Sequence, residues 1–406
     1  MSIMQNIRKI NSDLIYVGAS DRKLALFENI YPIPRGVSYN SYVLLDEKTV
    51  LLDTADAAVA GQFFENVTAA LQGRKLDYLV VNHMEPDHCA LIEDLVLRYP
   101  DVTIVTNAKA AKMIRQFFTF DLNSRLHTVA EGDTLCTGRH TLVFVMAPMV
   151  HWPEAMVTYD TLDKVLFSAD AFGTFGALNG NIYADEVNFE RDWLDDARRY
   201  LINIVGKYGT SVQTVLKKAA TLDIAMICPL HGPIWRQDLG WFINKYDIWS
   251  RYEAEERGIV IIYASIYGHT AEAAEKMASL LAERGIRNIA MYDASHTHDS
   301  QLVSECFRFS HALFAASTYN GGIFTPMESL LADLKAHNWQ NRTVALIENG
   351  TWGPLSGKLM RSQLEQMKGI TIEEPSITLL SALKESQIED LIQLADVLAT
   401  DIKSNI

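Results

Sequence analysis

Several common sequence features are absent from this chain of 406 residues. None of its four cysteines belongs to a C-x-x-C pair, and this absence excludes a thiolate zinc ribbon or a rubredoxin-like iron site. The scattered cysteines also give no sign of a disulfide framework. No apolar run reaches the roughly 18 residues that a membrane helix needs, and the N-terminus has no apolar signal core. We therefore expect a cytoplasmic protein that does not act in a membrane.

Positive charge and two common nucleotide-binding motifs are also scarce or missing. The chain has 36 Lys and Arg against 50 Asp and Glu, a formal net charge of −14, so duplex nucleic acid and anionic membranes would be repelled. Neither G-x-x-x-x-G-K-[ST] nor G-x-G-x-x-G occurs, which counts against a triphosphate site and an NAD site. Apolar residues, in contrast, make up 49% of the chain, and its length predicts two domains.

The two halves of the chain differ in the order in which strand and helix signals follow one another. Residues 1–253 alternate short β-rich runs such as "YLVVN" and "KVLFSAD" with turns and occasional helical stretches. Residues 254–406 repeat strand and helix in regular order, from "GIVIIYAS" and "TAEAAEKMASLLAERG" onward. Such repetition predicts a parallel sheet covered by helices on both faces. Between the halves, "GWFINKYDIWSRYEAEERG" has helical spacing and no proline, so we expect a helical join.

Metal-type ligands are crowded into "VNHMEPDHCAL", residues 81–91. His83 and Glu85 are expected on a strand end or loop, and because residues two apart in extended chain point the same way, Asp87 can converge with them. Pro86 bars a helix that continues from the start of the motif, and His88 follows Asp87 directly.

Three further candidate ligands follow runs of strand-forming residues. His151 comes after "TLVFVMAP", Asp170 ends "KVLFSAD" and His231 ends "MICPLH". Loops at strand ends are where a sheet scaffold presents chemistry. The succession resembles the metallo-β-lactamase superfamily, whose hydrolases carry H-x-H-x-D-H followed by His, Asp and His. The resemblance covers about residues 1–235 and implies an N-terminal αββα sandwich.

One departure from that pattern bears on the metal. Glu85 stands where a zinc hydrolase usually has histidine, so three carboxylates accompany four histidines. Ligands rich in carboxylate oxygen suit a pair of iron ions, and anionic oxygen donors stabilise the ferric state. Cys89 stands where a small Ala or Ser is frequent in the family. An accessible thiol there would make the site more sensitive to oxidation, whereas a buried thiol with an unperturbed pKa would be inert.

A second constellation lies at strand ends of the C-terminal half. The strand "IVIIYAS" runs into "SIYGHT" and then into a helix, whose free N–H groups, with the hydroxyls of Ser265 and Thr270, make an anion site suited to a phosphate monoester. Two later loops, "STYNGG" and "NGTWGP", lie at the same predicted sheet edge. This half, about residues 254–403, resembles flavodoxin, a doubly wound parallel-sheet domain that binds FMN.

The flavodoxin resemblance implies a set of cofactor-binding residues. They are Ser265, Ile266, Tyr267, Gly268, His269 and Thr270 for the phosphate, with Ser317, Thr318, Tyr319, Asn320, Gly321, Gly322, Asn349, Gly350, Thr351, Trp352 and Gly353 in the loops that flank the isoalloxazine. An aromatic side chain such as Tyr319 or Trp352 can stack on the flat ring.

Together the halves resemble the flavodiiron proteins over essentially the whole length. The resemblance implies reduction of dioxygen to water, of nitric oxide to nitrous oxide, or of both, with electrons that reach FMN from a separate donor such as rubredoxin. It also implies a head-to-tail homodimer or a dimer of such dimers. Carried over by motif, His83, Glu85 and His151 would bind one iron, Asp87, His88 and His231 the other, and Asp170 would bridge them. The competing hypothesis is a zinc-dependent hydrolase of the metallo-β-lactamase type with an appended flavodoxin domain.

Overall fold

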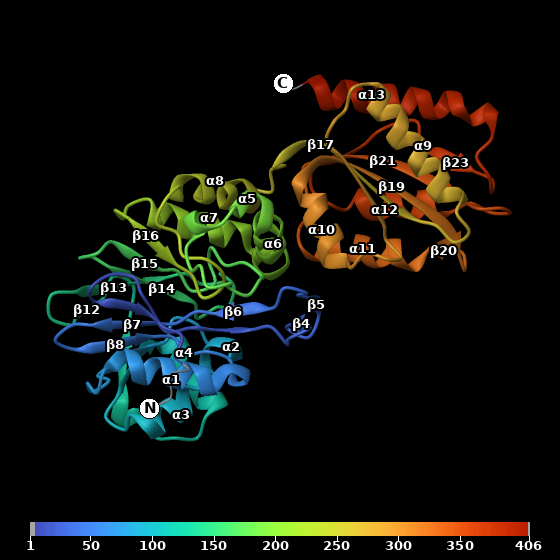
Figure 1. The fold of residues 1–406 in the computed structure, drawn as a ribbon. Coiled ribbons are helices and arrows are strands. Elements are labelled where there is room, and N and C mark those ends of the chain that lie inside the picture. The colour runs from blue at the N-terminus through green and yellow to red at the C-terminus, as the bar shows by residue number, and fades with distance from the viewer. Residues whose placement is uncertain (1–4, 405–406) are drawn as a thin grey trace. The chain divides into compact units, whose positions relative to one another are not determined.

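The computed structural model describes residues 5–404 and divides into two compact units, Met1–Tyr246 and Asp247–Ile406 (Figure 1). The division falls within helix α8 (Leu239–Ser250), in the segment where the sequence predicts a helix between the halves. Within the described range, no helix combines the length and the apolar character that crossing a bilayer requires.

The first unit contains two mixed sheets that pack face to face. The larger sheet has the order β1 (Arg8–Lys9), β2 (Leu14–Tyr16), β7 (Tyr42–Leu45), β8 (Thr49–Leu52), β9 (Tyr78–Val80), β10 (Thr103–Asn107) and β11 (Leu126–Val129). The second has the order β12 (Thr134–Cys136), β13 (Thr141–Met146), β14 (Met156–Asp160), β15 (Val165–Phe167) and β16 (Met226–Cys228). The rings of Tyr42 and Phe167, one from each sheet, lie 5.5 Å apart between centroids, so the core of this unit lies between the sheets.

Helices and two short strand pairs complete the first unit. The pairs are β3 (Ala19–Asp21) with β6 (Val37–Tyr39), and β4 (Leu26–Phe27) with β5 (Tyr31–Pro32). The helices are α1 (Ala60–Leu71), α2 (Pro86–Cys89), α3 (Ile92–Arg98), α4 (Ala108–Phe117), α5 (Phe189–Asp192), α6 (Leu194–Tyr200), α7 (Gly209–Ala219) and the first part of α8. In α1 the buried residues Phe63, Phe64, Val67 and Leu71 recur at helical spacing, so one face of the helix packs against the unit.

The second unit is a parallel sheet in the order that flavodoxin-like folds share. Its path runs β18 (Ile289–Asp293), β17 (Glu256–Ala264), β19 (Phe309–Tyr319), β21 (Arg342–Asn349) and β22 (Ile370–Ile372), with β23 (Ile377–Leu379) also parallel to β21 and β20 (Gly322–Ile323) antiparallel to β19. Numbered along this unit, the order is 2-1-3-4-5, and the reversal between the first and third strands opens the crevice where such sheets bind ligands.

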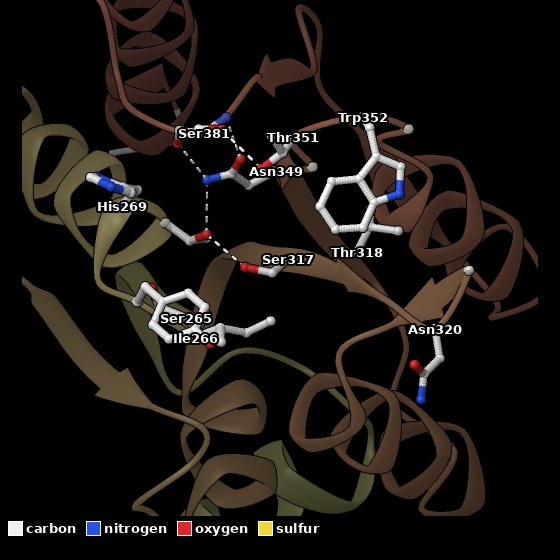
Figure 2. Close-up of a pocket in the computed structure, with 15 residues that line it drawn as sticks. Ser265, Ile266, His269, Ser317, Thr318, Asn320, Asn349, Thr351, Trp352 and Ser381 are labelled. Atoms are coloured by element: carbon white, nitrogen blue, oxygen red, sulfur yellow. Dashed lines mark hydrogen bonds between the residues drawn. The ribbon is translucent and has the colours of Figure 1, made fainter.

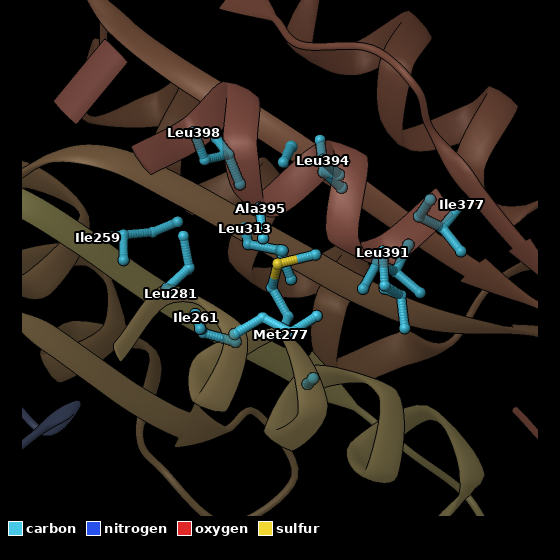
Figure 3. Packing of buried hydrophobic residues seen from close by; sticks show 14 of the residues in the cluster. Ile259, Ile261, Met277, Leu281, Leu313, Ile377, Leu391, Leu394, Ala395 and Leu398 are labelled. Atoms are coloured by element: carbon cyan, nitrogen blue, oxygen red, sulfur yellow. The ribbon is translucent and has the colours of Figure 1, made fainter. Parts of the chain in front are cut away.

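Helices cover both faces of this parallel sheet. On one face lie α9 (His269–Glu283) and α13 (Ile388–Ser404); on the other lie α10 (Asp299–Arg308), α11 (Thr325–Ala336) and α12 (Ser356–Leu364) (Figure 1). Figure 3 shows Met277 and Leu281 of α9 and Leu394 of α13 meeting strand residues in one apolar cluster. Each fully buried Leu or Met side chain contributes roughly 1.5–3 kcal/mol. Because both faces are covered, the central strands are apolar throughout, as the run Ile259–Ile262 illustrates.

Candidate metal centre and phosphate-binding pocket

The seven histidine and carboxylate residues singled out in the sequence lie together in the first unit. They form two groups of potential metal ligands: His83, Glu85, His151 and Asp170 in one, and Asp87, His88 and His231 in the other. Within each group the ligand atoms lie within 4.8 Å of one another. All seven side chains are buried, and none of the residues is more than 8% exposed.

Asp170 lies between the two groups. Its Oδ2 is 3.1 Å from His83 Nε2 and 3.2 Å from His151 Nε2. Its Oδ1 is 3.2 Å from His88 Nε2 and 3.6 Å from His231 Nε2. Because each carboxylate oxygen faces a different group, Asp170 has the geometry of a bridging ligand.

Strand ends bring these side chains together. Strands β15 and β16 are parallel neighbours, so the segments that follow them, with Asp170 and His231, emerge at the same sheet edge. His83 and Glu85 follow β9 in extended chain, but Pro86 is the first residue of α2, where its missing N–H costs nothing. Asp87 therefore does not converge with His83 and Glu85 as the extended-chain argument expected, and its Oδ2 instead lies 3.3 Å from His231 Nε2.

Outer contacts fix two of the imidazole rings. Glu154 Oε1 lies 2.9 Å from His83 Nδ1 and accepts a hydrogen bond of 2.9 Å from the Met84 N–H. His231 Nδ1 donates to the carbonyl oxygen of Ser38 at 2.8 Å. Both rings consequently turn Nε2 toward the ligand groups, and partners of this kind orient metal-binding histidines and raise their basicity.

The electrostatics of the cluster fit metal cations. Both oxygens of Asp87 and both of Asp170 are buried without a hydrogen-bond partner, an arrangement that is costly unless a cation satisfies them. Burial alone would lower the pKa of His88, but the carboxylates of Asp87 and Asp170 outweigh it and raise that pKa to about 9. Burial opposes a positive charge on His151 as well, yet Asp170 and Glu85 raise its pKa to about 9. The same negative field favours metal ions at this position.

Aromatic rings enclose the ligand groups. Phe27 of β4 meets His231 edge-on with centroids 5.4 Å apart, and the Tyr200 ring lies 5.5 Å from His231. On the other side Trp152 meets His83 edge-on at 5.5 Å. The Tyr200 hydroxyl is fully buried without a hydrogen-bond partner, and burial raises the pKa of Tyr200 well above its usual value. Apolar rings therefore cover part of the site, while Glu85, Asp87 and His151 retain 7–8% exposure.

Some residues of this centre were not predicted from the sequence. Glu154 occurs in "HWPEAM", three residues after His151, and the signal for it is the rule that metal-binding histidines pair with carboxylates. Tyr200 and Phe27 belong to distant segments without a recognisable pattern, so only the fold brings them to the site. Glu28 is an exposed residue on the β4–β5 hairpin, and partial desolvation of its carboxyl together with its contact with Glu85 raises its pKa to about 8.

A pocket of about 400 Å³ opens at the carboxyl edge of the parallel sheet in the second unit (Figure 2). It is lined by Ser265, Ile266, Tyr267, His269, Thr270, Ser317, Thr318, Asn320, Gly321, Asn349, Gly350, Thr351, Trp352, Gly353 and Ser381. All three predicted loops contribute to it. In Figure 2, Ser265 and Ile266 lie on one side of the pocket and Trp352 on the other.

Backbone groups and hydroxyls shape the floor of this pocket. Gly268 adopts a φ of +99° just before α9, a conformation that favours glycine, and its N–H donates to Ser265 Oγ at 3.1 Å. No side chain caps the first turn of α9, so its N–H groups are available to an anion. Thr270 Oγ1 lies 2.9 Å from Ser317 Oγ and accepts a hydrogen bond from Asn349 Nδ2 at 3.3 Å, which links the three loops.

The pocket departs from the sequence prediction at four positions. Gly268, Tyr319 and Gly322 do not line it: Gly268 forms the turn behind it, and the Tyr319 ring meets Phe324 edge-on with centroids 5.6 Å apart. Ser381, which no motif indicated, does line it. Its N–H donates to Asn349 Oδ1 at 3.0 Å and its hydroxyl lies 2.9 Å from Thr351 Oγ1. Trp352 is 95% exposed, so its ring is available to a flat ligand.

Comparisons with known proteins agree with both units. An ODP family β-lactamase model matches residues 37–232, and a flavodoxin model matches residues 261–373. A protein of Methanocaldococcus jannaschii is 27% identical over 97% of this chain and 98% of that protein. The anaerobic nitric oxide reductase flavorubredoxin of Pectobacterium atrosepticum is 29% identical over 88% of this chain and 70% of that protein.

Solved structures match almost the entire chain. The rubredoxin oxygen:oxidoreductase of Desulfovibrio gigas superposes with a TM-score of 0.91 at 27% identity and covers 98% of this chain and 99% of that one. The flavodiiron protein of Giardia intestinalis, at 22% identity, has a TM-score of 0.90 over 98% of each chain and supports the fold alone.

The chain is therefore an oxidoreductase that joins a β-lactamase-like domain to a flavodoxin domain, as the predicted fold class required. In both domains and over almost its whole length it is similar to flavodiiron proteins. The cofactors predicted for this family, FMN and a pair of irons, agree with the flavodoxin domain and with the two ligand groups.

Proposed function

We propose that this protein reduces dioxygen to water, nitric oxide to nitrous oxide, or both, at a pair of iron ions, with electrons that arrive through FMN from an external donor such as rubredoxin. One observation carries the proposal. The seven buried ligand side chains include the carboxylates of Asp87 and Asp170, whose oxygens have no hydrogen-bond partner, and the same chain also has a flavodoxin pocket. Relatives named for nitric oxide reduction and for oxygen reduction support the same reaction class.

The ligand groups suggest how two irons would be held. His83, Glu85 and His151 would bind one ion, and Asp87, His88 and His231 the other. Asp170, with one oxygen toward each group, would bridge them. When bound, two irons and FMN together can hold the four electrons that reduction of dioxygen to water requires.

The protein's own side chains keep that arrangement rigid and largely buried. Glu154 and the Ser38 carbonyl hold His83 and His231 by their Nδ1 atoms, so the Nε2 atoms stay directed at the ligand groups. Phe27, Tyr200 and Trp152 limit water in the same space. A water-poor site favours an uncharged gas over a charged substrate, because a charged substrate would lose its hydration on entry.

The flavodoxin pocket suggests how FMN would be held. The loop of residues 265–270 and the first turn of α9 offer hydroxyls and N–H groups to the phosphate. Trp352 lines the opposite side of the pocket and would stack on the isoalloxazine. Tyr319, which packs against Phe324, is the weaker candidate.

An anaerobic assay with a reduced donor tests the reaction. The iron- and FMN-loaded protein should consume dioxygen, nitric oxide or both, and comparison of the two rates identifies the preferred gas. Zinc in place of iron, together with hydrolysis of esters or thioesters, would refute the proposal in favour of the hydrolase.

The assembly is a second part of the proposal. We expect a head-to-tail homodimer, or a dimer of such dimers, in which the FMN of one subunit serves the irons of its partner. Sedimentation at the assay concentration tests this, because a monomer with full activity would contradict it.

A further inference from the structure

The β4–β5 hairpin carries a carboxyl side chain at its tip (Figure 1). Its strands pair Phe27 with Tyr31, and the Ile30 N–H donates to the Phe27 carbonyl at 3.0 Å, which closes the turn. The two central turn residues, Glu28 and Asn29, have φ values of +49° and +57°, as a tight hairpin turn of two twisted strands requires. Glu28 therefore has a fixed place on a short, hydrogen-bonded hairpin.

Aromatic packing fixes this hairpin against the metal centre. The Phe27 ring is 3% exposed and lies 5.4 Å from both the His231 ring and the Phe175 ring, between centroids. From the other strand, the Tyr31 ring reaches the same Phe175 ring at 6.3 Å. Because both strands pack on one buried ring, the residue that follows Phe27 is held beside the metal ligands.

Glu28 borders the exposed side of the ligand cluster. Four of the seven ligand residues have an exposure of 0%, whereas Glu85, Asp87 and His151 retain 7–8%. The same three residues surround the Glu28 carboxyl, which contacts Glu85 and lies in the electrostatic field of His151 and Asp87. Glu28 is itself exposed to solvent. Its side chain thus lies between the solvent and the exposed part of the cluster.

Glu85 presents one carboxylate oxygen to its ligand group. Its Oε2 lies 2.9 Å from His151 Nε2 and 3.4 Å from His83 Nε2. A carboxylate that presents one oxygen to a metal has a second oxygen that can accept a hydrogen bond. Glu85 is also the residue that stands where a zinc hydrolase usually has histidine, so its orientation bears directly on which metal the site prefers.

We propose that Glu28 is a positioning residue of the metal centre, which holds the Glu85 carboxylate from the solvent side by a hydrogen bond and keeps it directed at its ligand group. This inference rests on the proposed function. Glu154 holds the imidazole of His83 from the interior, and ligating carboxylates, like ligating histidines, depend on such outer partners. The first ligand group is therefore supported from both sides, and the support from the hairpin acts on one iron only.

Iron release from the iron- and FMN-loaded protein tests this role. The ferrous protein is mixed anaerobically with an excess of the chelator ferrozine, and the coloured complex is followed with time. In Glu28→Ala, the iron held by His83, Glu85 and His151 should leave about 10-fold faster or more, because its carboxylate ligand has lost its outer partner. The second iron of the same chain should keep its wild-type rate and serves as an internal control. The flavin absorption band should not change.

Three further variants separate the hydrogen bond from the hairpin. Glu28→Gln keeps the length of the side chain and an N–H group that can donate to Glu85, so both irons should leave within about twofold of the wild-type rate. Glu28→Gly removes the carboxyl but suits the positive φ, so the rapid release of one iron should persist even if Glu28→Ala does not fold. Ile30→Ala is the matched control, because Ile30 lies on the same hairpin and is 53% exposed.

Three results would overturn the inference: equal release of both irons from Glu28→Ala or Glu28→Gly, release from Glu28→Gln as rapid as from Glu28→Ala, or the same rapid release from Ile30→Ala. A wild-type protein that binds no iron would refute the proposed function and, with it, the role of Glu28. A wild-type protein that holds two irons and releases them as all variants do would refute the role of Glu28 alone.

Discussion

The two sites of this chain hold their ligands with different parts of the polypeptide. The metal centre consists of buried imidazoles and carboxylates on strand ends, and four of its carboxylate oxygens have no hydrogen-bond partner. The flavodoxin pocket consists largely of hydroxyls, amides and backbone N–H groups, and its aromatic rim is exposed. The first site depends on charge and on burial, and the second on backbone geometry. Single side-chain changes should therefore affect the first site far more strongly than the second.

The largest effect is expected at Asp170. Asp170→Asn removes the charge that faces both ligand groups, so binding of both irons should weaken by more than about 100-fold, beyond the loss usual for an outer-contact residue. Metal analysis and the flavin absorption band measure the two cofactors separately. FMN should remain bound, and a variant that retained both irons would show that Asp170 is no ligand.

A smaller effect is expected at Glu154, which touches only one imidazole. Glu154→Gln keeps the shape of the side chain but weakens the hold on His83, so iron affinity should fall about 10- to 100-fold. Glu190→Gln, an exposed glutamate in the same unit, is the matched control. Equal iron affinity in the two variants would mean that the Glu154 contact serves only the fold.

The flavodoxin pocket should tolerate a larger truncation. Trp352→Ala should raise the Kd for FMN only about 2- to 10-fold, which is the value of an aromatic stack, without loss of stability because the ring is 95% exposed. Tyr319→Ala should leave the Kd unchanged, because Tyr319 does not line the pocket. Fluorescence titration of the apoprotein with FMN distinguishes the two, and the opposite ranking would reassign the stacking residue.

Asp46 differs from the carboxylates of the metal centre, because it is a buried carboxylate with an oxygen that accepts hydrogen bonds from the protein. Burial raises its pKa, but hydrogen bonds from the His140 N–H at 2.8 Å and the Thr137 hydroxyl at 2.9 Å prevail and lower the pKa to about 2. Because the folded-state pKa lies below that of the unfolded chain, Asp46 stabilises the fold above about pH 4, and this contribution disappears as the pH falls toward 2.

Denaturant unfolding of wild type and Asp46→Asn at several pH values measures this contribution. The difference in the free energy of unfolding should be constant from pH 5 to 7 and should shrink as the pH falls below about 4. A difference that grows on acidification would contradict the assigned hydrogen bonds.

The sequence predicted the elements whose signal is local. The strand ends before Asp170 and His231, the glycine turn before α9 and the regular alternation of the second half all follow from short-range patterns. The extended-chain argument failed at Asp87, because Pro86 begins a helix there instead of only preventing one. Proline prevents a helix from continuing through it, but it suits the first helical position.

The remaining site residues depend on contacts between distant segments. Tyr200 and Phe27 reach His231 from 31 and 204 positions earlier in the chain, and Ser381 reaches Asn349 across 32 positions of sequence. No short-range pattern marks such residues, because packing of the whole domain decides their position. Charged and glycine-rich positions are visible in the sequence, whereas the apolar enclosure of a site emerges only from the fold.

The metal and flavin content of the purified protein, followed by its response to gas, tests the proposed reductase most directly. Close to two irons and one FMN per chain are expected, and the chemically reduced flavin should be reoxidised on anaerobic addition of nitric oxide or on addition of dioxygen. Zinc without iron, or a reduced flavin that neither gas reoxidises at the enzyme's turnover rate, would contradict it.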